Sequence, residues 1–314
     1  MVHRVIGKFG GTEPGALVVA TAALHGNEPA GVRALEAAFD LLNQTQGLEF
    51  KGTFIGLIGN LHAFANSSRF VERDFNRIWT PHHLEMVLGK GEQKLHGEDL
   101  ELLHLYQVIH ETIHSCNPDQ ILFLDLHTTS AGGGIFCIPT DENGSLHYAK
   151  ALHAPVILEL FNRVEGTLLR FATDGHFSDD IPVGQIHGVA YEAGQHDDPL
   201  SVSRSLSAIL NTLHYAGCVN DSAIKSPDEM ILQKSFSELP KVTRLVHAHH
   251  IKPGDTFKMR PGYVNFQRVK AGEHLADDIR GQVLAPYSGM ILMPLYQPQG
   301  SDGFFLVLEE EKRN

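Results

Sequence analysis

The sequence predicts an α/β protein with a mixed, mainly parallel central sheet flanked by helices, followed by a smaller β-rich domain. Through the first two thirds of the 314 residues, short apolar runs alternate with helical patterns, as in sheets that helices cover on both faces. From about Lys225 the pattern changes to short β-like runs separated by Pro and Gly turns. We therefore expect two domains, residues 1–224 and 225–314.

Continuous apolar runs in the first domain predict strands that are buried on both faces. These runs are residues 16–24, 53–60, 120–127 and 133–139. Apolar residues at helical spacing predict three helices, over residues 31–44, 99–115 and 205–217. Asn27 is the expected N-cap of the first helix, with Pro29 in its first turn. The polar stretch 88–97 is expected to be a surface insertion.

The second domain is expected to contain strands within four short runs, residues 244–251, 263–269, 282–294 and 304–310. The sequence HAHH at 247–250 has the composition of a metal cluster. Successive residues of a strand alternate between its two faces, however. We therefore interpret these histidines as mostly solvated surface.

Composition limits the partners that the protein can have. Lys and Arg number 25 against 37 Asp and Glu, a formal net charge of −12, which disfavours nucleic acids and anionic membranes as partners. The three cysteines are widely spaced and form no CxxC pair, so neither a disulfide framework nor a thiolate zinc site is expected. With no signal sequence and no long apolar run, we expect a soluble cytoplasmic protein that acts on a small molecule.

Residues with metal-binding side chains follow two of the predicted strands. In open α/β sheets, ligands bind beyond the carboxyl ends of the strands. His25 and Glu28 follow the first strand in HGNEPAG, and His127 ends a later strand in LDLHTT. Two histidines and a carboxylate are a standard set for catalytic zinc, which keeps its fourth position for water. Asp125 points to the same side of its strand as His127 and could hold that ring's tautomer.

An ordinary structural role is the alternative for each of these residues. The chain has 20 histidines, so an isolated HxxE is more often unrelated to metal than a ligand pair. Residues 67–79, SSRFVERDFNRIW, concentrate three arginines in an acidic protein. Asn76 and Arg77 could bind a substrate carboxylate, because a guanidinium forks onto a carboxylate and an amide adds a hydrogen bond. A helix face with local ion pairs explains the segment equally well.

Glu192 interrupts the apolar run GVAYEAGQH at 188–196, which otherwise reads as a buried strand. A carboxylate in such a run is costly unless it is paired or functional. Facing a metal-bound water, it could accept the proton and later deliver it to a leaving amine. A salt-bridged structural glutamate is the alternative.

Four motifs, taken in order, resemble the succinylglutamate desuccinylase and aspartoacylase family, a branch of the zinc carboxypeptidase-like fold. They are HGNEPAG, GNLHAFANSSRFVERDFNR, DLHTT and YEAGQ, and the resemblance spans residues 17 to 196 or so. The β-rich tail is similar to the C-terminal domain of that family, which partly covers the active-site entrance. The resemblance implies a hydrolase that cleaves the amide bond of a small N-acyl amino acid.

The resemblance also implies roles for individual residues. It implies one Zn²⁺ per chain, held by three ligands, His25, Glu28 and His127. Glu192 would be the general base that activates water, and Arg69 would polarise the scissile carbonyl and stabilise its oxyanion. Asn76 and Arg77 would bind the carboxylate of the amino-acid portion.

The sequence departs from aspartoacylase at two places that concern the substrate. TDGHFSDDIPVGQIHG lacks the arginine, and GSDGFFLV lacks the tyrosine, that grip the second carboxylate in that enzyme. N-acetylaspartate is therefore a poor substrate candidate, and we expect His176 and either Asp179 or Asp180 to line the pocket instead. A zinc carboxypeptidase acting on short peptides and a noncatalytic zinc-binding protein are the alternative functions. A homo-oligomer is compatible with the sequence.

Overall fold

The computed structural model describes residues 3–10, 13–220, 224 and 238–310. Eleven of its strands form one sheet: β1 (Val5–Gly10), β2 (Glu13–Ala22), β3 (Lys51–Ile58), β4 (Ile121–Thr129), β5 (Phe136–Pro139), β6 (Val156–Leu158), β7 (Ile186–Gln195), β8 (Val242–His250), β10 (Gln267–Val269), β13 (Gly289–Leu292) and β14 (Asp302–Glu309). Three further strands form a small second sheet: β9 (Lys258–Met259), β11 (His274–Asp278) and β12 (Gly281–Leu284).

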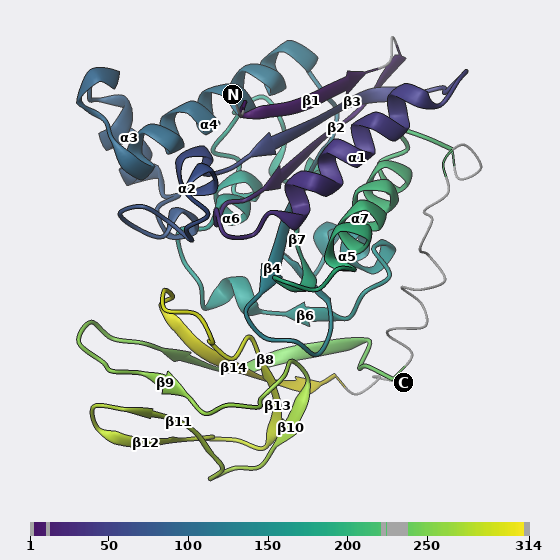
Figure 1. The fold of residues 1–314 in the computed structure, drawn as a ribbon. Coiled ribbons are helices and arrows are strands. Elements are labelled where there is room, and N and C mark those ends of the chain that lie inside the picture. The colour runs from purple at the N-terminus through teal and green to yellow at the C-terminus, as the bar shows by residue number, and fades with distance from the viewer. Residues whose placement is uncertain (1–2, 11–12, 221–223, 225–237, 311–314) are drawn as a thin grey trace.

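The large sheet has the order β1-β3-β2-β4-β7-β5-β6-β8-β14-β13-β10 (Figure 1). Strands β3, β2, β4 and β7 run parallel to one another at its centre, and β5, β6 and β8 form a second parallel group. The two groups meet at the antiparallel pair β5–β7. The predicted mixed, mainly parallel sheet is therefore confirmed for the central part of the fold.

Helices cover both faces of this sheet. The helices are α1 (Ala30–Gln44), α2 (Leu61–Ala65), α3 (Pro81–Leu88), α4 (Gly97–Cys116), α5 (Gly144–Ala151), α6 (Leu168–Thr173) and α7 (Ser201–Tyr215), with short 3-10 turns η1 (Phe75–Arg77), η2 (Glu92–Lys94), η3 (Leu160–Asn162) and η4 (Val183–Gln185). One core packs α1, α5 and α7 on one face, and a second packs α3, α4 and α6 on the other. Every residue of β4 is buried, as expected for a strand between two helical layers.

The C-terminal strands extend the same sheet instead of forming a detached one. β8 pairs in parallel with β6, and β14, β13 and β10 follow as an antiparallel continuation (Figure 1). The predicted β-rich tail is thus present. The division at residues 224 and 225 stays a prediction, because most of the segment 221–237 lies outside the described residues.

One local expectation is wrong and another is confirmed only in part. Asn27 does not cap α1: the N-cap is Pro29, which makes no side-chain cap hydrogen bond, and the Asn27 amide instead donates to Gln297 at 3.1 Å. Of the histidines in HAHH, His250 is exposed as expected, whereas His247 and His249 are partly buried, with their rings 5.9 Å and 5.0 Å from the ring of Phe304. Of the described helices, none is both long and apolar enough for a membrane span.

Candidate metal centre

His25 and Glu28 lie on the turn that leaves β2 and enters α1. Glu28 donates its backbone N–H to the carbonyl oxygen of His25 at 3.1 Å, and Gly26 donates to the carbonyl of Arg69 at 3.1 Å. A Cβ at Gly26 would lie 2.1 Å from the carbonyl carbon of Ala63, so only glycine permits this close approach to α2. The turn is therefore fixed between α2 and the segment that carries Arg69.

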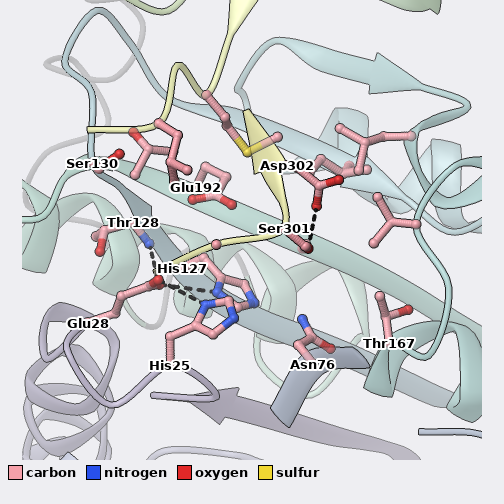
Figure 2. Close-up of a pocket in the computed structure, with 18 of the residues that line it drawn as sticks. His25, Glu28, Asn76, His127, Thr128, Ser130, Thr167, Glu192, Ser301 and Asp302 are labelled. Atoms are coloured by element: carbon pink, nitrogen blue, oxygen red, sulfur yellow. Dashed lines mark hydrogen bonds and ion pairs between the residues drawn. The ribbon is translucent and has the colours of Figure 1, made fainter. Parts of the chain in front are cut away.

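The structure brings the three predicted ligands together. One ligand atom from each of His25, Glu28 and His127 lies within 4.8 Å of the others. Glu28 Oε1 is 3.0 Å from His25 Nδ1, and its Oε2 is 3.1 Å from His127 Nδ1 (Figure 2). All three side chains are buried. Since carboxylate and imidazole are both zinc ligands, these residues form a set able to hold a metal ion.

Each histidine has its second ring nitrogen held by a carboxylate. His127 Nε2 is 2.7 Å from Asp125 Oδ2, and His25 Nε2 is 3.2 Å from Asp74 Oδ1. Asp125 in turn accepts the hydroxyl proton of Thr21 at 2.8 Å. This is the outer arrangement typical of metal-binding histidines, where a carboxylate fixes the ring and its tautomer. It leaves both Nδ1 atoms turned toward Glu28.

Charges in this cluster shift the pKa values of its members. Burial disfavours ionised Glu28, but His25 and His127 outweigh it and hold the pKa of Glu28 well below its ordinary value. Burial also opposes protonation of His127, yet Asp125 and Glu28 raise its pKa well above the usual value. Burial opposes ionisation of Asp74, but His25 and Arg69 lower its pKa well below normal. Attraction between imidazole rings and carboxylates thus helps to hold the cluster together.

Glu192 lies on β7, where its Cα pairs with that of His127 on β4. Glu192 is only 7% exposed, and its Oε2 has no hydrogen-bond partner among the residues that the structure describes. Burial raises the pKa of Glu192 to about 8. Figure 2 shows this carboxylate facing the same space as His127 and Glu28. An unpaired buried carboxylate beside a ligand set is more typical of a reacting group than of structural salt bridging.

The arginine-rich segment is a loop with the turn η1, not the helix face that was the alternative. Asp74 fixes the loop by accepting two hydrogen bonds. The donors are the backbone N–H of Asn76 and Arg69 Nη2, each at 3.0 Å. Arg69 Nη1 also lies 3.8 Å from Glu28 Oε1. Asp74 therefore links Arg69 to His25, a role that the sequence did not reveal because the contact spans 49 positions.

Asn76 and Arg77 both reach the same cavity, with different partners. Asn76 Oδ1 accepts the backbone N–H of Leu168 at 3.0 Å, so its Nδ2 donors face the cavity (Figure 2). Arg77 Nη2 donates to Asp302 Oδ2 at 2.8 Å. Asp302 belongs to β14, and its other oxygen is 2.6 Å from His250 Nδ1. The C-terminal strands thus contribute directly to the site.

One cavity contains all seven predicted site residues. Its walls enclose about 860 Å³, including solvent at the mouth, and it is lined by His25, Glu28, Arg69, Asn76, Arg77, Asp125, His127, Thr128, Thr129, Ser130, Ile138, Leu160, Phe161, Val164, Thr167, Ala190, Glu192, Met293, Leu295, Gln297, Gly300, Ser301, Asp302 and Phe305. His176, Asp179 and Asp180 do not line it, so that expectation is wrong. His176 instead packs against Phe171, with ring centroids 4.8 Å apart.

Fold and site together define an α/β protein with a two-histidine, one-glutamate set beyond the carboxyl ends of parallel strands. The chain belongs to the succinylglutamate desuccinylase/aspartoacylase family, since the family's catalytic-domain model matches residues 14–179. This confirms the resemblance drawn from the four motifs.

The chain is similar to succinylglutamate desuccinylases of several bacteria. It is 30% identical over 127 residues to that of Pseudomonas paraeruginosa (40% of this chain, 35% of the relative), so the match covers only about a third of that protein's length. It is 26% identical over 288 residues to that of Pseudomonas aeruginosa strain LESB58 (87% and 77%). The solved succinylglutamate desuccinylase from Chromobacterium violaceum shares the fold, with a TM-score of 0.63, 18% identity, and coverage of 96% of this chain and 87% of that chain.

Proposed function

We propose that this protein is a zinc-dependent hydrolase that cleaves the amide bond of small N-acyl amino acids. The observation that carries the proposal is the placement of Glu192, an unpaired buried carboxylate, in the same cavity as His25, Glu28 and His127. Membership of a family whose named relatives are desuccinylases supports the choice of substrate. A protein that only bound zinc would gain nothing from an uncompensated buried carboxylate.

The donor set fits zinc. Both histidines present Nδ1 toward Glu28 while carboxylates hold their Nε2 atoms, as second-shell groups do in zinc sites. Three protein ligands leave a position for water. When bound there, zinc lowers the pKa of water and polarises a carbonyl oxygen.

The protein's own residues perform the remaining steps. Glu192 accepts a proton from the attacking water and delivers it to the nitrogen of the leaving amine. Arg69, fixed by Asp74, stabilises the negative charge that develops on the carbonyl oxygen. Asn76 and Arg77 orient the substrate through its carboxylate.

Metal analysis and a substrate panel test this function. Elemental analysis should find about one zinc per chain, and amine release from N-acyl amino acids should stop with a chelator and return with added zinc. Short peptides serve as the comparison, because residues of the C-terminal strands close one side of the cavity. Cleavage of short peptides but of no N-acyl amino acid would favour the alternative function, a zinc carboxypeptidase. If the protein binds zinc but shows no chelator-sensitive hydrolysis of any amide, the proposed hydrolase function is refuted.

Replacing Arg77 by Ala is expected to raise KM about tenfold or more and to change kcat much less. The reason is that a group binding a nonreacting carboxylate contributes equally to ground and transition states. Steady-state kinetics on the best substrate of the panel measure both constants. Arg163→Ala is a matched control, since Arg163 is exposed and does not line the cavity. An unchanged KM would place the carboxylate site elsewhere.

Zinc binding is expected to release about one proton per chain near neutral pH. The pKa of His127 is raised well above its usual value, so its ring is protonated in the metal-free protein, whereas Glu28 is already ionised. The metal needs the neutral ring, so apparent affinity should rise with pH until His127 loses its proton. Calorimetry in two buffers of different ionisation heat counts the protons. If no proton is released, His127 is already neutral before zinc binds.

A further inference from the structure

The cavity has two kinds of wall around the candidate metal centre. Its polar lining includes Asn76, Arg77, Ser301 and Asp302, and both Arg77 and Ser301 donate to Asp302. The rest of the lining includes seven large apolar side chains from four stretches of the chain, Ile138, Leu160, Phe161, Val164, Met293, Leu295 and Phe305. A substrate must therefore offer this cavity a polar end and an apolar group.

Asp302 balances the charge of the guanidinium group that is proposed to bind substrate. Its Oδ2 accepts from Arg77 Nη2 at 2.8 Å and from the hydroxyl of Ser301 at 3.2 Å. Its Oδ1 is 2.6 Å from His250 Nδ1. With both oxygens engaged and only 10% of its side chain exposed, Asp302 is a fixed part of the wall and is not free to swing away.

Arg77 has N–H donors that are not used by protein acceptors, but its positive charge is balanced by Asp302. A guanidinium has five N–H donors, and Asp302 and the carbonyl oxygen of Asn76 are its two described acceptors. One substrate carboxylate can therefore bind the remaining donors together with the Asn76 amide.

A second substrate carboxylate would find no uncompensated cation. Among the described lining residues, the only guanidinium or ammonium groups are Arg69 and Arg77, against four carboxylates, Glu28, Asp125, Glu192 and Asp302. Arg69 is itself paired with Asp74 at 3.0 Å. A zinc ion would offset part of this excess but would be occupied by the reacting amide. Placing a further carboxylate against the apolar wall would desolvate it without a partner.

We propose that Asp302 makes this site selective for N-acyl amino acids with a single carboxylate and an apolar group, and against dicarboxylates. The inference rests on the proposed amidohydrolase function and narrows its substrate class. Asp302 acts through Arg77, by neutralising it, and is a specificity-determining residue without a part in the chemical step. The apolar group can belong to the amino acid or to the acyl chain, and the test separates the two.

Equilibrium binding to the zinc-loaded Glu192→Gln protein tests the proposal independently of turnover. The ligands are N-acetylleucine, N-hexanoylglycine, N-acetylaspartate and N-succinylglycine, with Kd measured by calorimetry; the last two are dicarboxylates, with the second carboxylate on the amino acid and on the acyl chain, respectively. At least one of the first two should bind about tenfold or more tightly than both dicarboxylates. Tighter binding of N-acetylleucine would show that the apolar wall contacts the amino-acid side chain, and tighter binding of N-hexanoylglycine that it contacts the acyl chain. Tighter binding of either dicarboxylate would overturn the proposal without need of a second variant.

Adding Asp302→Asn to the Glu192→Gln protein should reduce its preference for ligands with one carboxylate over dicarboxylates. Freed from its counter-charge, Arg77 should improve the Kd of N-acetylaspartate about tenfold relative to that of N-acetylleucine. Glu309→Gln is the matched control, because Glu309 lies on the same strand, is exposed and is outside the cavity. An unchanged ratio in a folded Asp302→Asn protein would also overturn the proposal.

Hydrolysis by the wild-type protein, measured on the same four compounds, separates this proposal from the function on which it rests. Selective binding without hydrolysis of any of them would retain the assigned pocket chemistry and refute the amidohydrolase function. Hydrolysis that favours the dicarboxylates would retain the amidohydrolase function and refute the role given to Asp302.

Discussion

Replacing Glu192 by Gln is expected to lower kcat about 10³-fold, a typical contribution of general acid–base catalysis, and to leave the zinc content unchanged. The amide keeps the size and shape of the carboxylate but cannot accept a proton at neutral pH. Glu192 is not among the three proposed ligands, so the zinc content should not change. Steady-state kinetics and elemental analysis of the same preparation measure the two effects.

The pH dependence of the wild-type protein provides a second measurement of the same role. Burial raises the pKa of Glu192 to about 8, and a bound dication would lower this pKa because positive charge favours the ionised carboxylate. A base must be ionised to act, so kcat/KM should rise with pH through a pKa below 8. The Gln variant should lack this limb. Glu165→Gln, at an exposed position outside the cavity, is the control, and a Glu192→Gln rate within about threefold of wild type would remove Glu192 from the mechanism.

Much of the candidate metal centre could be predicted because its residues obey local rules. His25 and Glu28 follow a buried strand directly, and His127 ends the neighbouring one. The carboxyl ends of parallel strands meet at one edge, so strand prediction alone brings these three together. Alternation along β4 likewise placed Asp125 beside His127, and the hydrogen bond between them confirms it.

Contacts between remote loops could not be predicted in this way. Residues 67–79 form a loop without periodicity, so nothing in their pattern showed that Asp74 reaches His25. Asp302 lies 225 positions from Arg77, and its strand joins the sheet only through β8 and β6. The segment GSDGFFLV showed only that a tyrosine is lacking, whereas the fold shows that its aspartate lines the cavity and pairs with Arg77.

The same distinction explains the error at Asn27. Asn before Pro is a common start of a helix, and local preference alone favours the cap. In the folded protein the Asn27 amide donates to Gln297, which also lies 3.3 Å from His196 Nε2. A tertiary contact with the C-terminal segment thus replaces the local one, at the turn that carries His25 and Glu28.

Replacing His127 by Ala is expected to abolish both metal binding and turnover, in contrast to Glu192→Gln. Loss of a ligand should weaken zinc affinity at least about 100-fold, so zinc should no longer raise the melting temperature of the variant, as ligand linkage makes it do for the wild type. Asp125, 1% exposed, would keep Thr21 as its only side-chain partner among the described residues, and an uncompensated buried charge is destabilising. The metal-free variant should therefore also melt below the metal-free wild type.

His83→Ala separates ligand loss from the loss of any buried histidine–carboxylate pair. His83 Nε2 lies 2.9 Å from Asp99 Oδ1, much as His127 lies by Asp125, but His83 is outside the cavity. This control should lose some stability and still bind one zinc per chain. His127→Gln, which retains a polar group beside Asp125, preserves the comparison if the Ala variant does not fold. Undiminished zinc binding in a folded His127 variant would show that the metal, and with it the proposed reaction, depends on other residues.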